Sequence, residues 1–470
     1  MPTGTAVVAG AGLAGMLAAS VLARRVGRVT LVERDALPSG PRPRRGVPQA
    51  RHAHLLMSGG VRALDALLPG TSDRLEAAGA RRVGMPGGVV SMSAYGWQRR
   101  FPSTRHIFAC SRELLDWVVG RAVLADPRIT LVEGADVTGL RGGPGAVTGV
   151  RVRPRDGGPE RELPADVVVN AAGRGSQLSR WLAELGAAVP EEEVIDPGTA
   201  YATRVFRAPP GAREGFPLVA IYADHREPVP GRNAVLLPIE DGRWIVTLSG
   251  TRGGEPSMAE EDFAECARRV RHPLIGTLIA GAEPLTPVYG SRSTANRRLR
   301  WADMAAWPEG LVVLGDALAA FNPVHGHGMS AAAHAAEALD RALARAPGPA
   351  GTREAQRAVA AAADDPWLLA TSLDVRYPGC RVRSADPRLT RRPPEGGPEF
   401  GDLLGSAALR DPEVSAAVID VNTLSGPLAG LQAPGVVAAL RRPPAHPPLG
   451  EPPITRKELD TVTSTARRHA

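Results

Sequence analysis

Residues 5–35, TAVVAGAGLAGMLAASVLARRVGRVTLVERD, decide the fold that we expect for this chain. The stretch opens with a short apolar strand, continues as an alanine-rich helix and ends in a second strand at Val29–Val32. Gly10, Gly12 and Gly15 stand between the first strand and the helix in the pattern G-x-G-x-x-G. In that order they allow a tight turn, the approach of a pyrophosphate to the backbone, and close packing of helix on strand. The stretch therefore predicts a βαβ unit that binds a dinucleotide at a helix N-terminus.

A carboxylate closes the second strand at the spacing that suits a ribose. Glu33 stands where an acidic side chain accepts hydrogen bonds from the adenosine ribose hydroxyls and repels a 2′-phosphate. A glycine turn without any ligand is the alternative, but it does not explain why strand, helix, strand and carboxylate follow in order. The nucleotide is then NAD or FAD. The residues that we expect at its phosphate and ribose end are Gly10, Gly12, Leu13, Ala14, Gly15, Glu33 and Arg34.

A buried strand late in the chain favours FAD over NAD. Leu311–Leu314 is followed by Gly315 and Asp316, by a turn, and by an alanine-rich helix from Met329 to about Ala344. In an enzyme that binds only NAD, such a late strand and Asp have no function. The ribitol chain and ring of a flavin, in contrast, extend past the first glycine turn and need a second backbone surface. The sequence therefore predicts an FAD-binding protein of the α/β class.

The Gly-Asp element resembles that of the flavoprotein monooxygenases of the p-hydroxybenzoate hydroxylase class. The resemblance implies that Asp316, which follows Gly315, hydrogen-bonds the ribitol. Backbone N–H groups and the N-terminus of the following helix would face N1 and the C2 carbonyl of the ring, where negative charge gathers on reduction. The residues that the resemblance places along the ring are Pro323, Gly326, Gly328 and Met329.

Two further positions bear on the same class. Arg112, after the N-cap-like Ser111, matches the arginine that commonly reaches the flavin; an exposed arginine in a first helical turn is the alternative. In ADVVVNAAGRGSQLSRWL, which starts at Ala165, Asn170 stands where the class has Asp. This departure puts in question any role that a carboxylate has there in handling FAD or NADPH.

Two His-x-His pairs, His52 with His54 and His325 with His327, raise the question of a metal site. Neither pair has a third ligand nearby, and no carboxylate or thiolate lies at the usual metal-ligand spacing. Joining the pairs into four ligands requires a fold in which both loops meet. We therefore expect no metal and interpret the histidines as polar loop residues beside flavin or substrate, with His327 near the ring.

Six stretches narrow the resemblance. They are RRGVPQARHAHLL from Arg44, YGWQRRFP from Tyr95, IEDGRWIVTLSGTRGGEP from Ile239, NRRLRWADMAAWPEGLVVLGDA from Asn296, FNPVHGHGMSAAAH from Phe321 and PWLLATSLDVRYPGC from Pro366. As a set they resemble the flavin-dependent epoxidases of polyether ionophore biosynthesis, of the monensin and lasalocid type. The resemblance implies an FAD monooxygenase that stereoselectively epoxidises alkenes of a linear polyene polyketide in polyether antibiotic biosynthesis.

The epoxidase resemblance also implies the reactants. O₂ would react with reduced FAD to give a C4a-hydroperoxide, whose distal oxygen an alkene attacks without a protein nucleophile, so that no acid or base residue is required. NADPH or NADH would supply the electrons, directly or through a partner flavin reductase. The expected substrate is a hydrophobic polyene polyketide, free or on an acyl carrier. The tunnel that holds this substrate is expected to have mostly aliphatic walls, because only 4% of the residues are aromatic.

An aromatic hydroxylase of the same class and a flavin-binding protein without catalytic activity are the alternatives. A hydroxylase needs a group that activates a phenol, which a His or Tyr of the substrate sheet can supply. A flavin halogenase is disfavoured, because it relies on an early lysine and a Trp-x-Trp motif, whereas Lys457 is the only lysine and no Trp-x-Trp occurs. No second G-x-G-x-x-G is present for a separate NADPH domain.

Composition limits the expected partners and location. The net charge is +7, but the basic residues are dispersed along the chain rather than gathered in a stripe, so we expect no nucleic acid. No apolar run reaches the roughly 18 residues of a membrane helix, so we expect no membrane partner. The N-terminus lacks a basic segment ahead of an apolar run, and the three cysteines are scattered, so the expected location is cytoplasmic.

Three units are expected from the order of these motifs. The first glycine turn and the Gly-Asp strand must meet on one nucleotide, so the Rossmann-like FAD-binding domain is discontinuous and a β-sheet substrate domain is inserted in it. A mostly helical, proline-rich region follows, and its last twenty or so residues are expected to be disordered. The predicted ranges are 1–80, 105–180 and 290–345 for the FAD-binding domain, 81–104 and 181–289 for the substrate-binding sheet, and 346–470 for the C-terminal region.

Overall fold

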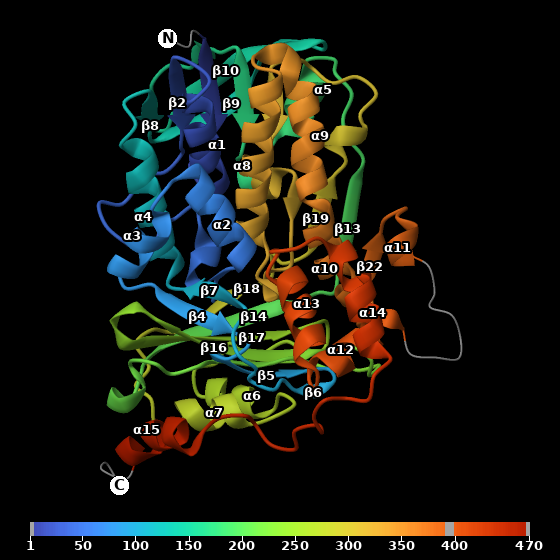
Figure 1. The fold of residues 1–470 in the computed structure, drawn as a ribbon. Helices are drawn as coiled ribbons and strands as arrows, with labels where there is room; N and C mark the ends of the chain where they lie inside the picture. Colours follow the sequence, from blue (N-terminus) through green and yellow to red (C-terminus); the bar gives the residue numbers. More distant parts are fainter. Residues whose placement is uncertain (1–3, 391–398, 467–470) are drawn as a thin grey trace.

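A five-stranded parallel sheet forms one end of the computed structural model, which describes residues 4–390 and 399–466 (Figure 1). Its strands are short, rich in valine and mostly buried, as expected for a parallel sheet that is covered on both faces. The order β20-β12-β1-β2-β8 places segments from both halves of the chain side by side. The strands are β1 (Thr5–Ala9), β2 (Arg28–Val32), β8 (Ile129–Val132), β12 (Val167–Asn170) and β20 (Leu311–Val313).

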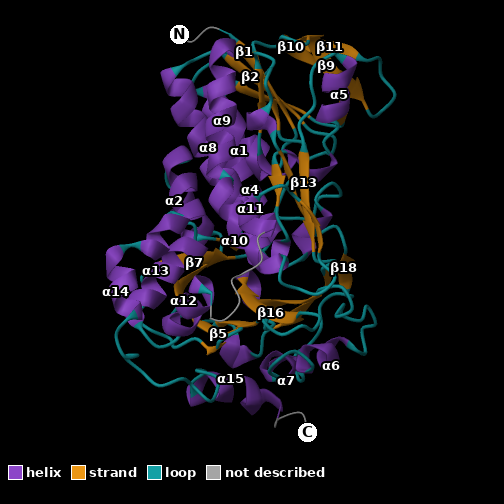
Figure 2. Ribbon diagram, turned by 90° about the vertical axis from the view of Figure 1, so that its right-hand side faces the viewer, coloured by secondary structure: helices purple, strands orange, loops and turns teal. Residues whose placement is uncertain are grey.

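Helices cover one face of this sheet and a small antiparallel sheet covers the other (Figure 2). Helix α1 packs between α4 and α8, and α9 packs along α8 and β20. Alanine fills most buried positions of α8, which lets the neighbouring helices approach closely. The helices are α1 (Leu13–Ala23), α4 (Arg112–Leu124), α8 (Gly328–Arg345) and α9 (Thr352–Ala362), and the small sheet consists of β9 (Ala135–Gly143), β10 (Ala146–Pro154) and β11 (Arg161–Pro164).

A seven-stranded sheet lies at the other end of the molecule (Figure 1). Its side chains alternate between two layers: Phe206 and Trp244 pack with the residues of α6 and α7, whereas Val205 and Ile245 pack with Met57 on the side of the nucleotide-binding end. The elements are β18 (Tyr289–Ser291), β14 (Ala200–Arg207), β17 (Arg243–Gly250), β16 (Arg232–Ile239), β15 (Leu218–Ile221), β5 (Val89–Ser93), β6 (Gly96–Trp97), α6 (Phe263–Arg268) and α7 (Leu274–Ile279).

Two smaller antiparallel sheets connect the two ends. The order β3-β7-β4 joins the start of the chain to the segment ahead of α4, and the order β21-β19-β13-β22 joins the segment after β20 to C-terminal residues. The strands are β3 (Leu55–Leu56), β4 (Arg81–Met85), β7 (Arg105–Ala109), β13 (Glu192–Asp196), β19 (Asn296–Leu299), β21 (Ala319–Ala320) and β22 (Arg381–Arg383). The remaining helices of this half are α2 (Ser58–Leu67), α3 (Thr71–Ala77) and α5 (Leu178–Glu184).

The C-terminal residues form a helical layer beside the seven-stranded sheet (Figure 1). Three of its helices share a small core of their own. The end of this layer reaches the nucleotide-binding end, where the Asn422 carbonyl lies 3.1 Å from His327 Nε2 and the Leu424 carbonyl lies 3.0 Å from His334 Nε2. The helices are α10 (Asp364–Asp374), α11 (Pro387–Thr390), α12 (Phe400–Ala408), α13 (Pro412–Asn422) and α14 (Pro434–Leu440).

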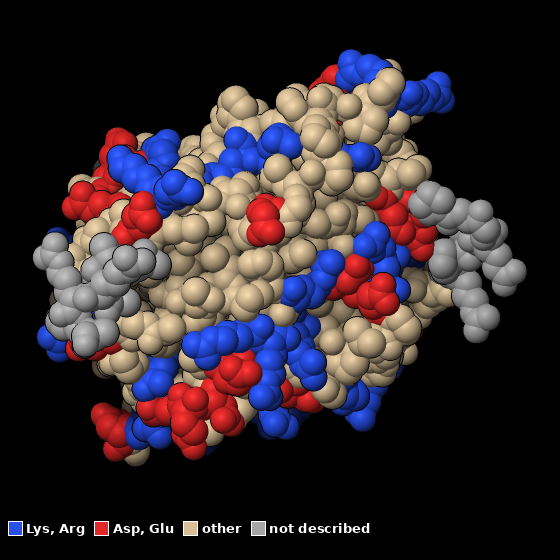
Figure 3. Space-filling model, turned by 90° about the horizontal axis from the view of Figure 1, so that it is seen from below, with Lys and Arg blue, Asp and Glu red and all other residues tan. Residues whose placement is uncertain are grey.

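Helix α15 (Arg456–Ala466) corrects one expectation, because it lies in the region predicted to be disordered. Leu459 and Val462 give the helix an apolar side that packs beneath the seven-stranded sheet, and Glu458 pairs with Arg100 at 2.8 Å. Residues 467–470 lie outside the described part of the chain. Figure 3 views the molecule from this end and shows basic and acidic side chains interspersed around a broad uncharged area.

The predicted fold class is confirmed: a parallel-sheet Rossmann-like unit is combined with a separate β-sheet unit and a mostly helical C-terminal region. The residue ranges given to the three units stay a prediction. Among the described residues, every helix is too short or too polar to span a lipid bilayer.

Candidate functional site

The carboxyl ends of four parallel strands bring the predicted nucleotide-binding motifs to one edge. The register pairs the last residues of neighbouring strands, Ala9 with Val32 and with Asn170, and Asn170 with Val313. The turns that follow β1, β2 and β20 therefore lie in a row along this edge, where open α/β sheets bind their ligands. The structure thus brings together the motifs that the sequence analysis assigned to the two halves of FAD.

The glycines of the first turn differ in what surrounds them. Gly10 has a φ of +98°, in the left-handed region that favours glycine. A Cβ at Gly15 would lie 1.8 Å from the Gly10 carbonyl oxygen, whereas a Cβ at Gly12 would meet no atom within 4 Å. The N–H groups of Leu13 and Ala14, in the first turn of α1, have no partner within the helix. Open space in front of free N–H groups fits a pyrophosphate.

Glu33 is buried at the end of β2, and the sequence analysis missed its ion-pair partner. Its Oε2 accepts a hydrogen bond from the Ala11 N–H at 2.7 Å and pairs with Arg44 Nη2 at 2.9 Å. Arg44 also donates to the Ala11 carbonyl at 2.8 Å, and its buried Nε has no partner among the described residues. The predicted Arg34 is exposed and donates to the Gly46 carbonyl at 3.4 Å. Arg44 is therefore the guanidinium that contacts Glu33.

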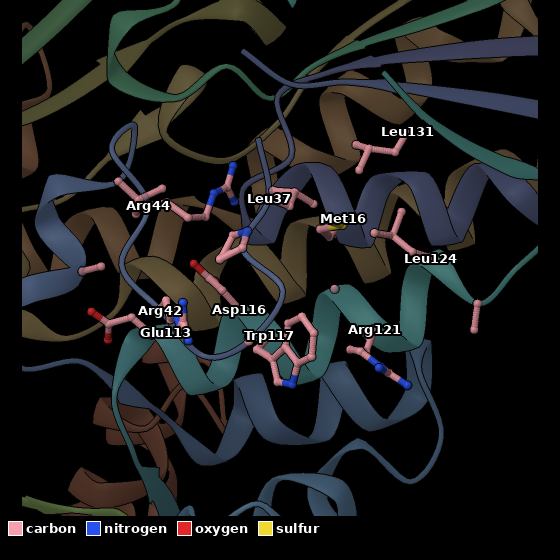
Figure 4. A pocket seen from close by; sticks show the side chains of 16 residues that line it. Met16, Leu37, Arg42, Arg44, Glu113, Asp116, Trp117, Arg121, Leu124 and Leu131 are labelled. Atoms are coloured by element: carbon pink, nitrogen blue, oxygen red, sulfur yellow. The ribbon is translucent and has the colours of Figure 1, made fainter. Parts of the chain in front are cut away.

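A cavity of about 350 Å³ adjoins the Glu33–Arg44 pair (Figure 4). Helix α1 contributes Met16 to its lining, the loop after β2 contributes Leu37 and Arg44, and α4 contributes Trp117. The lining also carries the carboxylates of Glu113 and Asp116, and apolar walls with a few charged groups are typical of small-molecule sites. Next to a carboxylate placed for a ribose, this lining suits the adenosine end of a dinucleotide.

Asp316 stands at the other end of the edge, in the turn after β20, which Gly315 allows with a φ of +65°. Arg174 Nε lies 3.7 Å from Asp316 Oδ2, and Arg174 is itself held by two backbone carbonyls at 2.7 and 2.5 Å. Burial raises the pKa of Asp316, and the charges of Arg174 and Arg112 oppose that rise. A carboxylate in this setting is suited to accept a hydrogen bond from a ligand hydroxyl.

Arg112 is the first residue of α4 and is buried, so the alternative of an exposed surface arginine is wrong. Its Nε donates to Asp116 Oδ1 at 2.7 Å. Burial, followed by the charge of Arg112, lowers the pKa of His54 to about 3. The charge of the same guanidinium also opposes the rise in the pKa of Asp316.

Asn170 keeps the hydrogen bonds that a carboxylate would make at this position. Its side chain is buried, and its Oδ1 accepts from Ser176 Oγ at 3.0 Å and from the Ala172 N–H at 3.4 Å. The amide therefore fixes the turn after β12 without burying a charge.

Residues 321–329, which we call the ring loop, run from β21 into the first turn of α8. Gly326 has a φ of +67° and ends a short 3₁₀ turn, and a Cβ at Gly328 would meet no atom within 4 Å. Pro323 is exposed, whereas Met329 is buried. Open backbone at the N-terminus of an 18-residue helix fits the edge of a flavin ring, where negative charge gathers.

A buried polar network that the sequence analysis missed holds the ring loop. Asn322 accepts from the Tyr201 hydroxyl at 3.0 Å and donates to Asp374 Oδ2 at 2.9 Å. Asn296 donates to the same oxygen at 2.7 Å, and His325 Nε2 lies 3.0 Å from Asp374 Oδ1. Sequence spacing gave this histidine no carboxylate partner, yet the fold brings one from the end of α10. The only available signal was that Asn296 and Asp374 lie within stretches of the family resemblance.

The histidines of both pairs make hydrogen bonds within the protein. His52 Nδ1 lies 2.8 Å from Thr203 Oγ1, and His327 Nε2 contacts the Asn422 carbonyl. Burial lowers the pKa of His52 and of His327 to about 4, so both are neutral near pH 7. No three His, Cys, Asp or Glu side chains within the described ranges are placed to share a metal ion. His327 adjoins Gly328, and its position near the ring stays a prediction.

Comparison with known proteins identifies the family. A family model described as an FAD binding domain matches residues 3–357. Protein Rv3254 of Mycobacterium tuberculosis is 32% identical over 421 residues, which cover 86% of each chain. Kynurenine 3-monooxygenase of Salinispora arenicola is 30% identical over 353 residues, which cover 73% of this chain and 72% of that protein.

The fold comparison agrees with the sequence comparison. The structure of PqsL, a probable FAD-dependent monooxygenase from Pseudomonas aeruginosa, superposes with a TM-score of 0.58 at 22% identity, over 80% of this chain and 97% of PqsL. At that identity the similarity shows the fold alone. From the family model and the two relatives, the chain belongs to the FAD-binding family of p-hydroxybenzoate hydroxylase-like monooxygenases, and its cofactor is FAD.

Proposed function

We propose that this FAD monooxygenase stereoselectively epoxidises alkenes of a linear polyene polyketide in polyether biosynthesis. The observation that carries the proposal is the surface that faces the ring loop. On the side of the seven-stranded sheet that packs with Met57, Val205, Val235, Leu237 and Ile245 form an aliphatic cluster. Thr203 and Thr247 of the same face are hydrogen-bonded to each other at 2.8 Å. An alkene chain makes no polar contacts and needs such a wall to exclude water.

The residues of the edge have defined roles in this proposal. Glu33 binds the adenosine ribose, the open backbone at Gly12 binds the pyrophosphate, Asp316 binds the ribitol, and the ring loop lines the flavin ring. Bound FAD supplies the two-electron reduction and the reaction with O₂. NADPH or NADH provides the electrons, directly or through a partner reductase. The polyene arrives free or on an acyl carrier.

Aromatic hydroxylation is the second candidate, and two observations favour it. A relative at 30% identity is named kynurenine 3-monooxygenase. In addition, His52 is hydrogen-bonded to Thr203 on the sheet surface that faces the ring loop, where an imidazole can take the proton of a phenol.

Product masses from ¹⁸O₂ test the proposal. The FAD-loaded protein is reduced and given ¹⁸O₂ with a linear polyene acid or, in parallel, with kynurenine and simple phenols. One labelled oxygen per reacted alkene, in a product that fragments as an epoxide, supports epoxidation. A labelled phenol with unreacted polyene overturns it in favour of hydroxylation, and O₂ consumption that no substrate alters indicates a flavin-binding protein without catalytic activity.

A substitution at Thr203 separates the two oxygenations. Thr203→Val removes the partner of His52 with little change in volume. Epoxidation needs no protein base, so labelled epoxide should form at the wild-type rate. Hydroxylation that depends on His52 should fall about 10-fold or more, since positioned bases contribute that much. Thr148→Val, the same substitution at an exposed position of β10, is the control.

A further inference from the structure

A buried histidine–carboxylate pair lies where helix α10 meets the ring loop. Asp374 is the last residue of α10, which lies between the two large sheets in both ribbon views (Figures 1 and 2). Its side chain is 2% exposed, and its Oδ1 lies 3.0 Å from Nε2 of His325, whose side chain is 11% exposed. The pair is thus nearly sealed within the protein, on the loop assigned to the flavin ring.

Among the described residues, His325 is the basic side chain that contacts Asp374. Its second oxygen accepts two amide hydrogen bonds, from Asn296 and Asn322. Within residues 4–390 and 399–466 no arginine or lysine pairs with it. A buried carboxylate without a cation is unfavourable. The hydrogen bond to His325 is therefore the one contact that Asp374 makes with a basic side chain in the described part of the chain.

The hydrogen bond fixes which nitrogen of His325 can exchange a proton. A carboxylate accepts, so Nε2 carries its hydrogen toward Asp374 and Nδ1 is left as the free nitrogen. Nδ1 has no hydrogen-bond partner among the described residues. The neighbouring His327 ring stacks at 6.2 Å between centroids, but its Nε2 is engaged by Asn422 and burial keeps it neutral. Nδ1 of His327 also lacks a partner but is buried, so His325 Nδ1 is the ring nitrogen of this loop that is both unbonded and outside the buried set.

We propose that His325, oriented by Asp374, carries a proton from solvent to the reacting oxygen beside the flavin. This inference rests on the proposed oxygenation. That reaction takes one O₂, two electrons from reduced FAD and two protons; one oxygen atom enters the substrate and the other leaves as water. Nδ1–H of His325 gives a proton to the oxygen that leaves, Nδ1 is reprotonated from solvent, and Asp374 acts as a positioning residue through its hydrogen bond to Nε2.

Reoxidation of the reduced protein by O₂ tests the proton carrier without any substrate, because the peroxide released then also takes up protons. FAD-loaded protein is photoreduced and mixed with oxygenated buffer, and the flavin absorbance is followed. His325→Ala should slow reoxidation about 10- to 100-fold at equal FAD content, in the range of positioned acid–base groups. Added imidazole at constant pH and ionic strength should restore most of the rate, because it refills the space and the proton function.

Asp374→Asn provides the second variant. The amide keeps the shape and its oxygen still accepts from Asn296, but its NH₂ group now donates to His325 and moves the ring proton to Nδ1. Reoxidation should slow in the same direction, without rescue by imidazole, since the His325 ring still fills its place. Asp364→Asn, at the other end of α10, is the control and should reoxidise like the wild type.

The outcomes separate this inference from the proposed function. FAD-loaded His325→Ala or Asp374→Asn protein that reoxidises at the wild-type rate overturns the proton carrier, and so does a slow His325→Ala protein that imidazole leaves unchanged. If the wild-type protein reoxidises normally but yields no labelled epoxide, the proposed substrate is wrong. The result for the proton carrier then still stands.

Discussion

The two ends of the proposed flavin site are built in opposite ways. Backbone groups form the proposed phosphate end. Gly10, Gly12 and Gly15 are close in sequence, and each is needed there because it has no side chain. Side chains hold the proposed ring end. Asn322 is hydrogen-bonded to Tyr201 and to Asp374 in the interior, and the three residues come from distant segments of the chain. A short stretch of sequence can predict a site that backbone groups form. A buried side-chain network, in contrast, depends on segments that come together only after the chain has folded.

Gly15→Ala should produce the largest effect on the phosphate end. The new Cβ would lie 1.8 Å from the Gly10 carbonyl oxygen, which is backbone, and 3.4 Å from the Cβ of Ala171. We expect the free energy of unfolding of the FAD-free protein to fall by about 3 kcal/mol, at the upper end of overpacking costs. Chemical denaturation measures it. An unchanged midpoint would mean that α1 does not pack on the turn as described.

Gly12→Ala sharpens the contrast, because it acts on the ligand instead of the fold. Its Cβ meets no protein atom within 4 Å, and the backbone at Gly12 is extended, with φ −72° and ψ 179°. The FAD-free protein should unfold at the wild-type midpoint or slightly above it. FAD should bind about 10-fold or more weakly, because the methyl group occupies the space of the pyrophosphate. Full FAD affinity in a titration would refute the assignment of this turn.

Asp316→Asn should give a smaller effect. It should weaken FAD binding, but it should not lower the stability of the FAD-free protein. FAD affinity should fall about 10-fold, the value of one hydrogen bond to a charged acceptor. Burial raises the pKa of Asp316 above its value in the unfolded chain, so the carboxylate lowers stability as pH rises through that pKa. At neutral pH the FAD-free variant should therefore be at least as stable as the wild type, and the difference should vanish in acid.

FAD titration and thermal unfolding from acid to neutral pH measure both effects of Asp316→Asn. A variant that retains full flavin occupancy would contradict the ribitol role. Arg180→Gln, at an exposed position on α5, serves as a control for the loss of a surface charge.

Tyr201→Phe should give the smallest effect and tests the ring end. Burial raises the pKa of Tyr201 well above its usual value, so the hydroxyl is protonated and donates to Asn322. Its loss should cost about 1 kcal/mol of stability and leave FAD affinity unchanged. Denaturation and FAD titration of the same variant measure both values. A large loss of FAD would show that the network contributes to cofactor binding as well as to the position of the loop.

The sequence predicted the parallel sheet and the glycine turn after β1, because periodicity and glycine spacing act over about 30 residues. It did not predict the Arg44–Glu33 pair, which depends on the path of a loop that has no periodicity. It also could not link Asp374 with Asn296, because their contact depends on how α10 docks against β19. Asn170 shows the reverse case: its departure from the family pattern was visible, but the two hydrogen bonds it retains were not.

The contact between the ring loop and the C-terminal layer has a consequence for protein synthesis. The partners of His325 and His327 are residues 374 and 422, and α1 packs against α8, so neither end of the site is complete when β20 leaves the ribosome. A chain that ends before residue 374 would lack both of these hydrogen bonds of the ring loop.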